Sequence, residues 1–411
     1  MKKSLNRRSF LRLGAITGLA SGLPAHALGD QAIAVDTSKS AIGVQRYVTL
    51  GKTGLRISDI SFGSSRLRSG QEHLVEHAYD LGINYFDTAE SYSNGHSEPV
   101  IGNALKGKRD KVVIVTKTVT STRTRQGTMM RSLEESLRNL QTDYIDIYFD
   151  HAVNDVARLK NPEWNAFVEK AKRQGKIRFT GMSGHAGHLA ECVEYAAENE
   201  LFDVMLLAQN FGEDPTFYDR ITRSFDFVAN QSALPAAMIK AREKNIGIVA
   251  MKVLRGAKLN DMRPYEIGGA TFSQAAFRWA LNNTSVDAVI ISMTSKDQID
   301  EYLGASGSGA VTQEDMRLLQ QYAQMTDMTY CRHACNDCEG ACPYGVPIAD
   351  VMRSRMYATD YGDFSFAKSE YAMLGDAASA CLGCDGAPCR DACTHKIPIA
   401  DLCGPTHQLL G

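Results

Sequence analysis

The sequence predicts an α/β protein in which a closed barrel of eight parallel strands, alternating with helices, is followed by a small α-helical domain. Three observations lead to this prediction. From Val48 onward, short β-branched runs alternate with amphipathic stretches and are separated by Gly, Asn or Asp. Nine of the ten cysteines lie between Cys331 and Cys403. The 411 residues suffice for one large domain and a smaller one.

The charge balance excludes one broad class of partner. Charged residues make up 22% of the chain, and the formal net charge is −2. Broad nucleic-acid-binding or anionic-membrane-binding surfaces need a basic excess that this chain lacks. We therefore expect no nucleic-acid partner.

Residues 1–27 have the features of an export signal. Arg7 and Arg8 precede a short apolar stretch, Leu13 to Leu23, and Ala25 to Ala27 supply small residues before a cleavage point. The stretch is rich in Gly and Ala, so no stable membrane span is expected. The segment resembles a twin-arginine (Tat) signal, which implies passage of the folded protein through the Tat translocase to the periplasm. A disordered basic tail is the alternative.

Residues 28–45 lack periodicity and are predicted to be a linker, and residues 46–326 are predicted to form the barrel. Such a chain of β-then-α units predicts a (β/α)8 barrel of the TIM type. An open doubly wound sheet is the alternative, but no strand is followed by Gly-x-Gly-x-x-Gly. The connection from Phe211 to Leu234 is unusually long, which fits either a lid or plain surface packing. The predicted strands are 59–63, 83–88, 112–117, 144–149, 177–182, 203–209, 247–253 and 288–293, and helical patterns between them include Glu72–Leu81, Met129–Leu140, Glu163–Gln174, Leu189–Asn199, Ala236–Asn245 and Phe272–Leu281.

Four ionisable residues follow the rule that reactive groups of such a barrel lie at the carboxyl ends of strands. Asp87, Lys117 and His151 end three successive predicted strands, and Tyr92 lies five residues after Asp87. A phenol has a reference pKa near 10, and an adjacent ammonium favours the phenolate and lowers that pKa. A carboxylate would hold the ammonium, and a neutral imidazole would orient a carbonyl oxygen. Such a group can protonate a carbonyl oxygen while hydride reaches its carbon.

These residues resemble the Asp-Tyr-Lys-His tetrad of the aldo/keto reductase family, over about 280 residues of the chain. Matching segments include Leu50–Leu55, Gly82–Ala89 and Lys176–Ser183. The resemblance implies an oxidoreductase acting on a small carbonyl or alcohol, with Tyr92 as general acid. It also implies NADP or NAD as cofactor, with nicotinamide contacts from Ser183 and Gln209.

The chain departs from the family pattern at two places. The family commonly has asparagine after its serine, where this chain has Gly184 and then His185. After the last strand, Thr294 stands where the family has a basic residue that holds the nucleotide phosphate. Loss of that charge weakens recognition of a 2′-phosphate, so NADPH and NADH both stay open. The expected cofactor contacts in this region are Ser292, Thr294, Ser295, Lys296 and Gln298.

Residues 327–411 contain two cysteine sets, each followed by a Pro-Ile-Ala-Asp tail, so the segment is an internal repeat. The close spacing favours metal over a disulfide framework, and four cysteines within a dozen residues favour iron over zinc. The helical character expected between the sets, over 348–357 and 366–374, favours an α-helical fold. Cys403 has no assigned role, and Cys192 is expected to be packed in a helix. The sets are Cys331, Cys335, Cys338 and Cys342, and Cys381, Cys384, Cys389 and Cys393.

This segment resembles a bacterial two-cluster ferredoxin, in which three close cysteines and one from the other set bind each 4Fe–4S cluster. The resemblance implies that Cys393 completes the first cluster and Cys342 the second. Two features depart from the usual ferredoxin motif. Some cysteines are separated by three or four residues instead of two, and Thr394 follows Cys393 where a proline is expected.

Two hypotheses for the function follow. The first is an exported aldo/keto reductase-like oxidoreductase whose clusters transfer electrons, with an electron carrier protein as partner. The second is a nicotinamide-independent electron-transfer or assembly protein, in which the barrel binds a partner and the clusters are structural.

Overall fold

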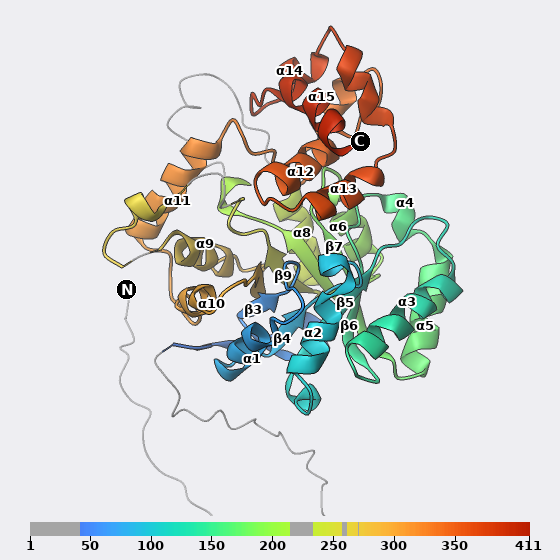
Figure 1. Ribbon diagram of the computed structural model, residues 1–411, viewed down its shortest axis with the longest axis vertical. Helices are drawn as coiled ribbons and strands as arrows, with labels where there is room; N and C mark the ends of the chain where they lie inside the picture. Colours follow the sequence, from blue (N-terminus) through green and yellow to red (C-terminus); the bar gives the residue numbers. More distant parts are fainter. Residues whose placement is uncertain (1–41, 214–232, 257–260, 270) are drawn as a thin grey trace, which may run out of the picture. The chain divides into compact units, whose positions relative to one another are not determined.

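The structure is a computed structural model that describes residues 42–213, 233–256, 261–269 and 271–411. Eight parallel strands form a closed barrel in the order β10-β3-β4-β5-β6-β7-β8-β9 (Figure 1). The predicted barrel is confirmed, and every predicted strand agrees with an observed one to within two residues at each end. The strands are β3 (Ile60–Gly63), β4 (Tyr85–Asp87), β5 (Val113–Thr118), β6 (Ile145–Asp150), β7 (Ile177–Gly184), β8 (Val204–Ala208), β9 (Gly247–Met251) and β10 (Ala288–Ser292).

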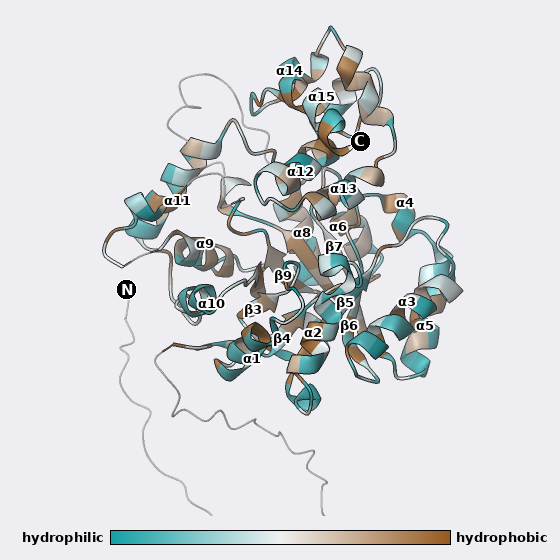
Figure 2. Cartoon of the chain, in the orientation of Figure 1, coloured by the Kyte–Doolittle hydropathy of each residue, from teal (hydrophilic) through white to brown (hydrophobic). Residues whose placement is uncertain are grey.

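Helices surround the barrel because each has one apolar face to bury. In α3, for example, Met129, Leu133 and Leu137 are buried against the barrel core, the i, i+4 spacing of an amphipathic helix. The strands are mostly brown in Figure 2, and teal gathers on the outer helices. The helices are α1 (Glu72–Asp80), α2 (Ser97–Ala104), α3 (Gln126–Asn139), α4 (Val156–Leu159), α5 (Pro162–Arg173), α6 (Leu189–Glu198), α8 (Leu234–Glu243), α9 (Phe272–Leu281), α10 (Lys296–Leu303) and α11 (Gln313–Thr326).

A short hairpin that the sequence did not predict precedes the barrel. Its strands β1 (Tyr47–Thr49) and β2 (Arg56–Ser58) are antiparallel. Leu50, between them, is buried against Gly247 at the first residue of β9. The Lys52 N–H donates to the carbonyl of Asn245, just before that strand. The hairpin therefore covers the amino-terminal end of the barrel, which leaves the carboxyl ends of the strands as the open rim.

The C-terminal segment is helical, as the sequence predicts. It has its own apolar core, in which Val351, Ala367 and Ile399 are buried. The repeated Pro-Ile-Ala-Asp tails begin its two 12-residue helices, with Pro347 and Pro398 as the residues before the first turn. Proline suits a helix start, because the first N–H groups of a helix have no partner within it. The helices are α12 (Ile348–Thr359), α13 (Phe364–Ala372), α14 (Pro388–Ala392) and α15 (Ile399–Leu410).

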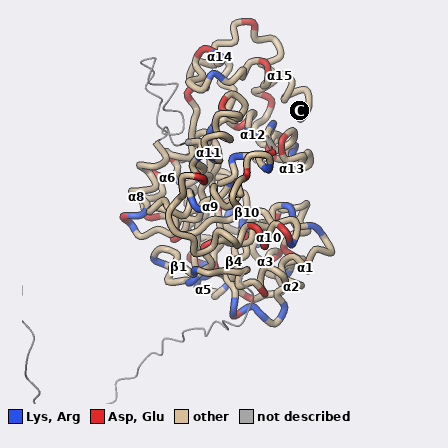
Figure 3. The backbone as a smooth tube through the Cα atoms, turned by 90° about the vertical axis from the view of Figure 1, so that its left-hand side faces the viewer, with Lys and Arg blue, Asp and Glu red and all other residues tan. Residues whose placement is uncertain are grey.

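Residues Lys39–Gly411 form one compact unit, and the predicted division of the chain at residue 326 stays a prediction. No helix within the described ranges is long and apolar enough to cross a membrane. Basic and acidic residues are interspersed along the chain in Figure 3, without one large patch of either sign in that view. The predicted export signal and most of the long connection from Phe211 to Leu234 lie outside the described residues.

Gly181 in β7 is required by close packing inside the barrel. A Cβ atom there would lie 2.3 Å from the Phe149 ring and 2.6 Å from the carbonyl oxygen of Val204. We expect Gly181→Ala to lower the free energy of unfolding by about 1–3 kcal/mol, because the neighbouring strands must move apart. Urea unfolding followed by circular dichroism measures the loss. Gly309→Ala is the control, since a Cβ there meets nothing within 4 Å; equal stability of the two variants would contradict the packing argument.

Candidate active site

The predicted tetrad gathers at the open rim of the barrel. Asp87 is the last residue of β4, Lys117 lies at the end of β5, and His151 follows β6 directly. The Lys117 ammonium contacts the Asp87 carboxylate at 2.5 Å and the Thr88 carbonyl at 2.6 Å. Its nitrogen is 3.4 Å from the Tyr92 hydroxyl. The rings of Tyr92 and His151 meet edge to face, with centroids 5.5 Å apart. The four side chains can therefore act on one substrate atom.

Burial determines the protonation of these groups. It raises the pKa of the Tyr92 phenol well above its usual value, and the charges of Asp87 and Glu370 raise it further. The expectation that Lys117 lowers this pKa is therefore wrong for the structure, because desolvation of the phenolate outweighs the ammonium. Burial also lowers the pKa of His151 well below 6.5, assisted by the charge of Lys117. Near neutral pH the structure thus contains a protonated phenol and a neutral imidazole.

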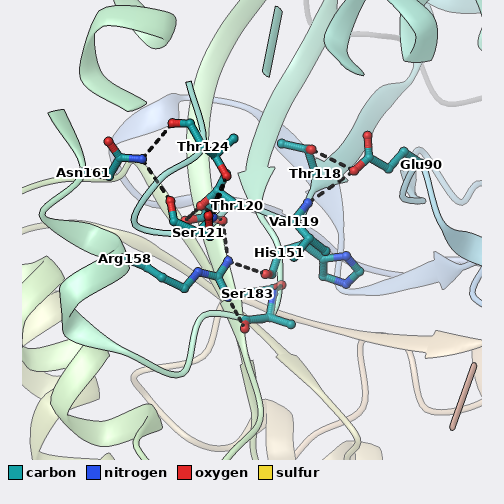
Figure 4. A network of polar contacts seen from close by, with 12 residues as sticks. Glu90, Thr118, Val119, Thr120, Ser121, Thr124, His151, Arg158, Asn161 and Ser183 are labelled. Carbon is teal, nitrogen blue, oxygen red and sulfur yellow. Dashed lines mark hydrogen bonds and ion pairs between the residues drawn. The ribbon is translucent and has the colours of Figure 1, made fainter. Parts of the chain in front are cut away.

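A partly buried arginine fixes the loop that carries His151 (Figure 4). Arg158 donates to the Asp150 carboxylate at 2.7 Å and to the carbonyls of His151 at 2.8 Å and Ala152 at 2.9 Å. The Ala152 N–H in turn donates to the Ser183 hydroxyl at 2.9 Å. Charge-assisted bonds of this kind hold a backbone firmly. The imidazole of His151 is therefore held at the rim by its backbone, while its Nδ1 is buried without a hydrogen-bond partner among the described residues.

A cavity of about 380 Å³ opens above the tetrad, within the range of small-ligand sites. Lys117 stands behind Asp87 and Tyr92 instead of on the cavity wall. Of the expected residues, its walls contain Asp87, Tyr92, His151, Ser183, Ser292, Thr294 and Gln298.

Three predicted cofactor contacts are not on the cavity wall. Gln209 is buried, and its amide oxygen lacks a hydrogen-bond partner within the described part of the chain. The Ser295 hydroxyl accepts from the Gln298 N–H and so caps α10. Lys296, the first residue of α10, is exposed. The amide oxygen of Gln298 already accepts from the hydroxyl of Thr294 at 2.8 Å.

The cavity also contains residues that the sequence interpretation missed. Lys252 directly follows β9 and could have been found by the strand-end rule that identified Lys117. His185 stands at the site of a family departure. Four further missed residues come from the C-terminal segment, and no local signal connects them with the barrel. They are Tyr357, Tyr361, Asp363 and Phe366.

The loop after β7 holds the C-terminal segment against the rim. Nδ1 of His333 donates to the carbonyl of His185 at 2.7 Å, because a carbonyl can only accept. Nε2 of His333 then accepts from the Tyr330 hydroxyl at 2.7 Å. The Ala334 N–H bonds the Ala186 carbonyl at 3.1 Å. Gly184 and His185, the two residues that depart from the family pattern, therefore lie where the C-terminal segment docks on the barrel.

The ten cysteines are all free, and Cys192 is buried in the barrel core. A first group of thiols combines Cys331 and Cys335 with Cys393 of the second set. Burial and, to a smaller extent, the charges of Asp337, Cys331 and Cys393 raise the pKa of Cys335 to about 12. Cys338 belongs to the same group. A second, small cavity is lined by Cys342, Cys381, Cys384, Cys389 and Cys403.

Each group thus contains the fourth cysteine of the other sequence set. The thiol of Cys403 is hydrogen-bonded to that of Cys381. In the described ranges, no group of three or more His, Cys, Asp or Glu side chains is arranged to hold a metal ion. Iron–sulfur clusters are therefore not shown.

Comparison with known proteins identifies the barrel. The model of the aldo/keto reductase family matches residues 59–324, so the cysteine-rich segment lies outside the match. L-galactose dehydrogenase of Arabidopsis thaliana is 26% identical over 295 residues, covering 62% of this chain and 86% of that protein. A putative voltage-gated potassium channel subunit beta of Schizosaccharomyces pombe is 26% identical over 314 residues, with coverage of 62% and 86%.

Solved structures agree with the barrel fold. Aldo-keto reductase AKR11C1 of Bacillus halodurans, in its holo form, superposes with a TM-score of 0.53 at 20% identity, covering 67% of this chain and 95% of that one. A putative aldo-keto reductase of Pseudomonas aeruginosa has a TM-score of 0.50 at 24% identity, with coverage of 64% and 97%. At these identities the likeness shows the fold alone.

The buried pair of Lys117 and Asp87 generates a stability prediction. Lys117→Met leaves the Asp87 carboxylate buried without its cation, so we expect a loss of about 3–5 kcal/mol in the free energy of unfolding. The double variant Asp87→Asn, Lys117→Met removes both charges and should recover most of that loss. Urea unfolding of the three proteins measures this. A double variant no more stable than the single one would contradict the proposed charge pairing.

Proposed function

The chain belongs to the aldo/keto reductase family, and we propose that it interconverts a carbonyl compound and its alcohol at the barrel rim, with Tyr92 as general acid and base. The observation that carries the proposal is the hydrogen-bonded group of Asp87, Lys117 and Tyr92 facing His151 across the floor of the cavity. Membership of the family makes the protein an oxidoreductase. The roles of the four tetrad residues are part of the proposal.

The chemistry follows from the proton affinities. A carbonyl oxygen placed between Tyr92 and the imidazole of His151 is a weak base and takes no proton from a phenol whose pKa is raised. As the carbon is reduced, the oxygen gains alkoxide charge and becomes more basic than a phenolate. Tyr92 then donates its proton, and Lys117, 3.4 Å away, stabilises the phenolate that forms. Oxidation of the alcohol runs through the same steps in reverse.

The residues near the rim fit the nicotinamide end of a cofactor. The buried amide oxygen of Gln209 lacks a donor within the described residues, and the carboxamide N–H of a nicotinamide is a suitable donor. Ser183 lines the cavity above the tetrad, whereas Gln209 does not. When bound, NADPH or NADH would supply hydride to the carbonyl carbon. Thr294 and Lys296 are both exposed, so the proposal includes either cofactor.

We further propose that the cysteine groups bind two 4Fe–4S clusters. The free thiols, their repeated spacing and the exchange of Cys342 and Cys393 between the groups support this. Such clusters pass one electron each when bound, and two electrons with two protons convert a carbonyl to an alcohol. An electron carrier protein would be the external partner.

The hydrogen bonds between the first cysteine group and the cavity favour electron transfer over a purely structural role. Arg353 contacts the Cys331 carbonyl at 3.4 Å and Nε2 of His333 at 3.4 Å. His333 bonds the carbonyl of His185, whose ring lies 3.5 Å from the Tyr357 hydroxyl on the cavity wall. Clusters that only stabilised the fold would not require these hydrogen bonds between the first cysteine group and the cavity.

Export is also part of the proposal. The arginine pair Arg7 and Arg8, the apolar stretch and the small residues that follow support Tat transport of the folded protein to the periplasm. Transport after folding would protect clusters that are inserted in the reducing cytoplasm.

The role of Tyr92 is tested with Tyr92→Phe. We expect turnover of 4-nitrobenzaldehyde, supplied with NADPH, NADH or dithionite-reduced viologen, to fall at least about 100-fold, because the proton donor is lost. Tyr361→Phe is the matched control, since that tyrosine also lines the cavity. Turnover of Tyr92→Phe within a few-fold of the wild type would refute the assignment.

Anaerobic purification of the chain from the periplasm tests both export and iron binding. We expect about eight iron and eight acid-labile sulfide per chain, as two 4Fe–4S clusters contain. Cys384→Ser should lose close to half of the iron, whereas Cys192→Ala, at a free thiol of the barrel core, should keep it all. Zinc without sulfide would contradict the cluster proposal, and recovery only from the cytoplasm would contradict export.

A further inference from the structure

Lys252 places a cation on the cavity wall that the proposed chemistry at Tyr92 does not use. The residue follows β9, lines the cavity and donates to the Tyr357 hydroxyl at 2.9 Å. This is the single hydrogen bond of its ammonium within the described part of the chain, so two of its three N–H donors are left for a ligand. Its backbone has a φ of 58°, a strained conformation for lysine of the kind that collects at functional sites.

The groups around Lys252 leave its charge only partly neutralised. Burial and, to a smaller extent, the neighbouring Arg353 lower its pKa to about 7, against the effect of Glu370. Burial raises the pKa of Glu370 itself to about 7, so this carboxyl is largely uncharged at slightly acid pH. His151 and His185 nearby are held neutral by burial and by the charge of Lys252. An anion from outside is the missing partner.

The other acidic residues of the cavity are already engaged. Asp87 holds Lys117 in an ion pair, and Asp363 accepts from the Phe366 N–H at the start of α13. Neither is available to pair with Lys252. The cavity wall also contains Arg66, a second cation. The balance of charges therefore favours an anionic group in the ligand.

Lys252 lies close enough to the tetrad to bind a second group of the same substrate. Lys252 and Tyr357 line the same cavity of about 380 Å³ as Tyr92 and His151, and the charge of Lys252 acts on His151. A carboxylate a few bonds from a carbonyl would thus reach Lys252 while the carbonyl oxygen contacts Tyr92. Ammonium and phenol donors together suit a carboxylate, which accepts at two oxygens.

We propose that the substrate class of this enzyme is small oxo acids and the corresponding hydroxy acids, whose carboxylate is bound by Lys252 and by Tyr357 from the C-terminal segment. The proposal rests on the proposed function for the position of the carbonyl. The C-terminal segment thus contributes Tyr357 to the substrate site, in addition to any role of its cysteines.

The kinetic test compares 4-oxobutanoate with methyl 4-oxobutanoate, which differ in charge at one end. For the holoprotein, we expect Lys252→Met to lower the ratio of kcat/KM values, acid over ester, at least about 10-fold, the usual effect of losing a charged hydrogen bond. Lys252→Arg should restore most of the preference, and Tyr357→Phe should lower it a few-fold. Lys106→Met, at an exposed lysine, is the control for a general change of charge.

A binding test keeps this inference separate from the proposed catalysis. Calorimetric titration with 4-hydroxybutanoate should give the same Kd for wild type and the control Lys106→Met and a Kd at least about 10-fold weaker for Lys252→Met. An unchanged acid-to-ester ratio and Kd in a folded Lys252→Met variant, or an effect confined to the affinity for NADPH or NADH, would overturn the inference and leave the proposed function intact. Binding that depends on Lys252 without turnover of either substrate would instead uphold this site and refute the function proposed for Tyr92.

Discussion

Closure of eight parallel strands into one barrel is the constraint on which the rest of the structure depends. It brings the carboxyl ends of all strands to a single rim, so Asp87 and His151, which are far apart in the chain, meet at one cavity, with Lys117 paired to Asp87 behind its wall. The hairpin before the barrel covers the opposite end. Only the rim is left to receive a substrate and to contact the C-terminal segment.

The ion pairs at this rim are stable because each charge is compensated by its partner. The charge of Lys117 is matched by Asp87 at 2.5 Å, and that of Arg158 by Asp150 at 2.7 Å. The imidazoles of His151 and His185 avoid the cost by staying neutral. Lys252 is the exception, since its contact is a neutral phenol. The ammonium of Lys252 is therefore a cation on the cavity wall whose charge is available to a ligand.

The C-terminal segment changes what the barrel can recognise. It docks on the loop after β7, where the carbonyl of His185 accepts a hydrogen bond from Nδ1 of His333. The same segment provides Tyr357 and Phe366 to the cavity wall. Helix α12 thus contributes Tyr357 to the cavity at the barrel rim and Ile348 to the lining of the small cavity between the cysteines.

The sequence by itself determined the barrel, the tetrad and the helical character of the C-terminal segment. These depend on local patterns: strand and helix periodicity, residues at strand ends, and cysteine spacing. Tertiary structure decided what depends on desolvation and docking. The pKa of Tyr92 rises where the adjacent Lys117 suggested a fall, because burial outweighs a single charge. Lys252 and Tyr357 lie more than a hundred residues apart, and only the packing of α12 over the rim joins them.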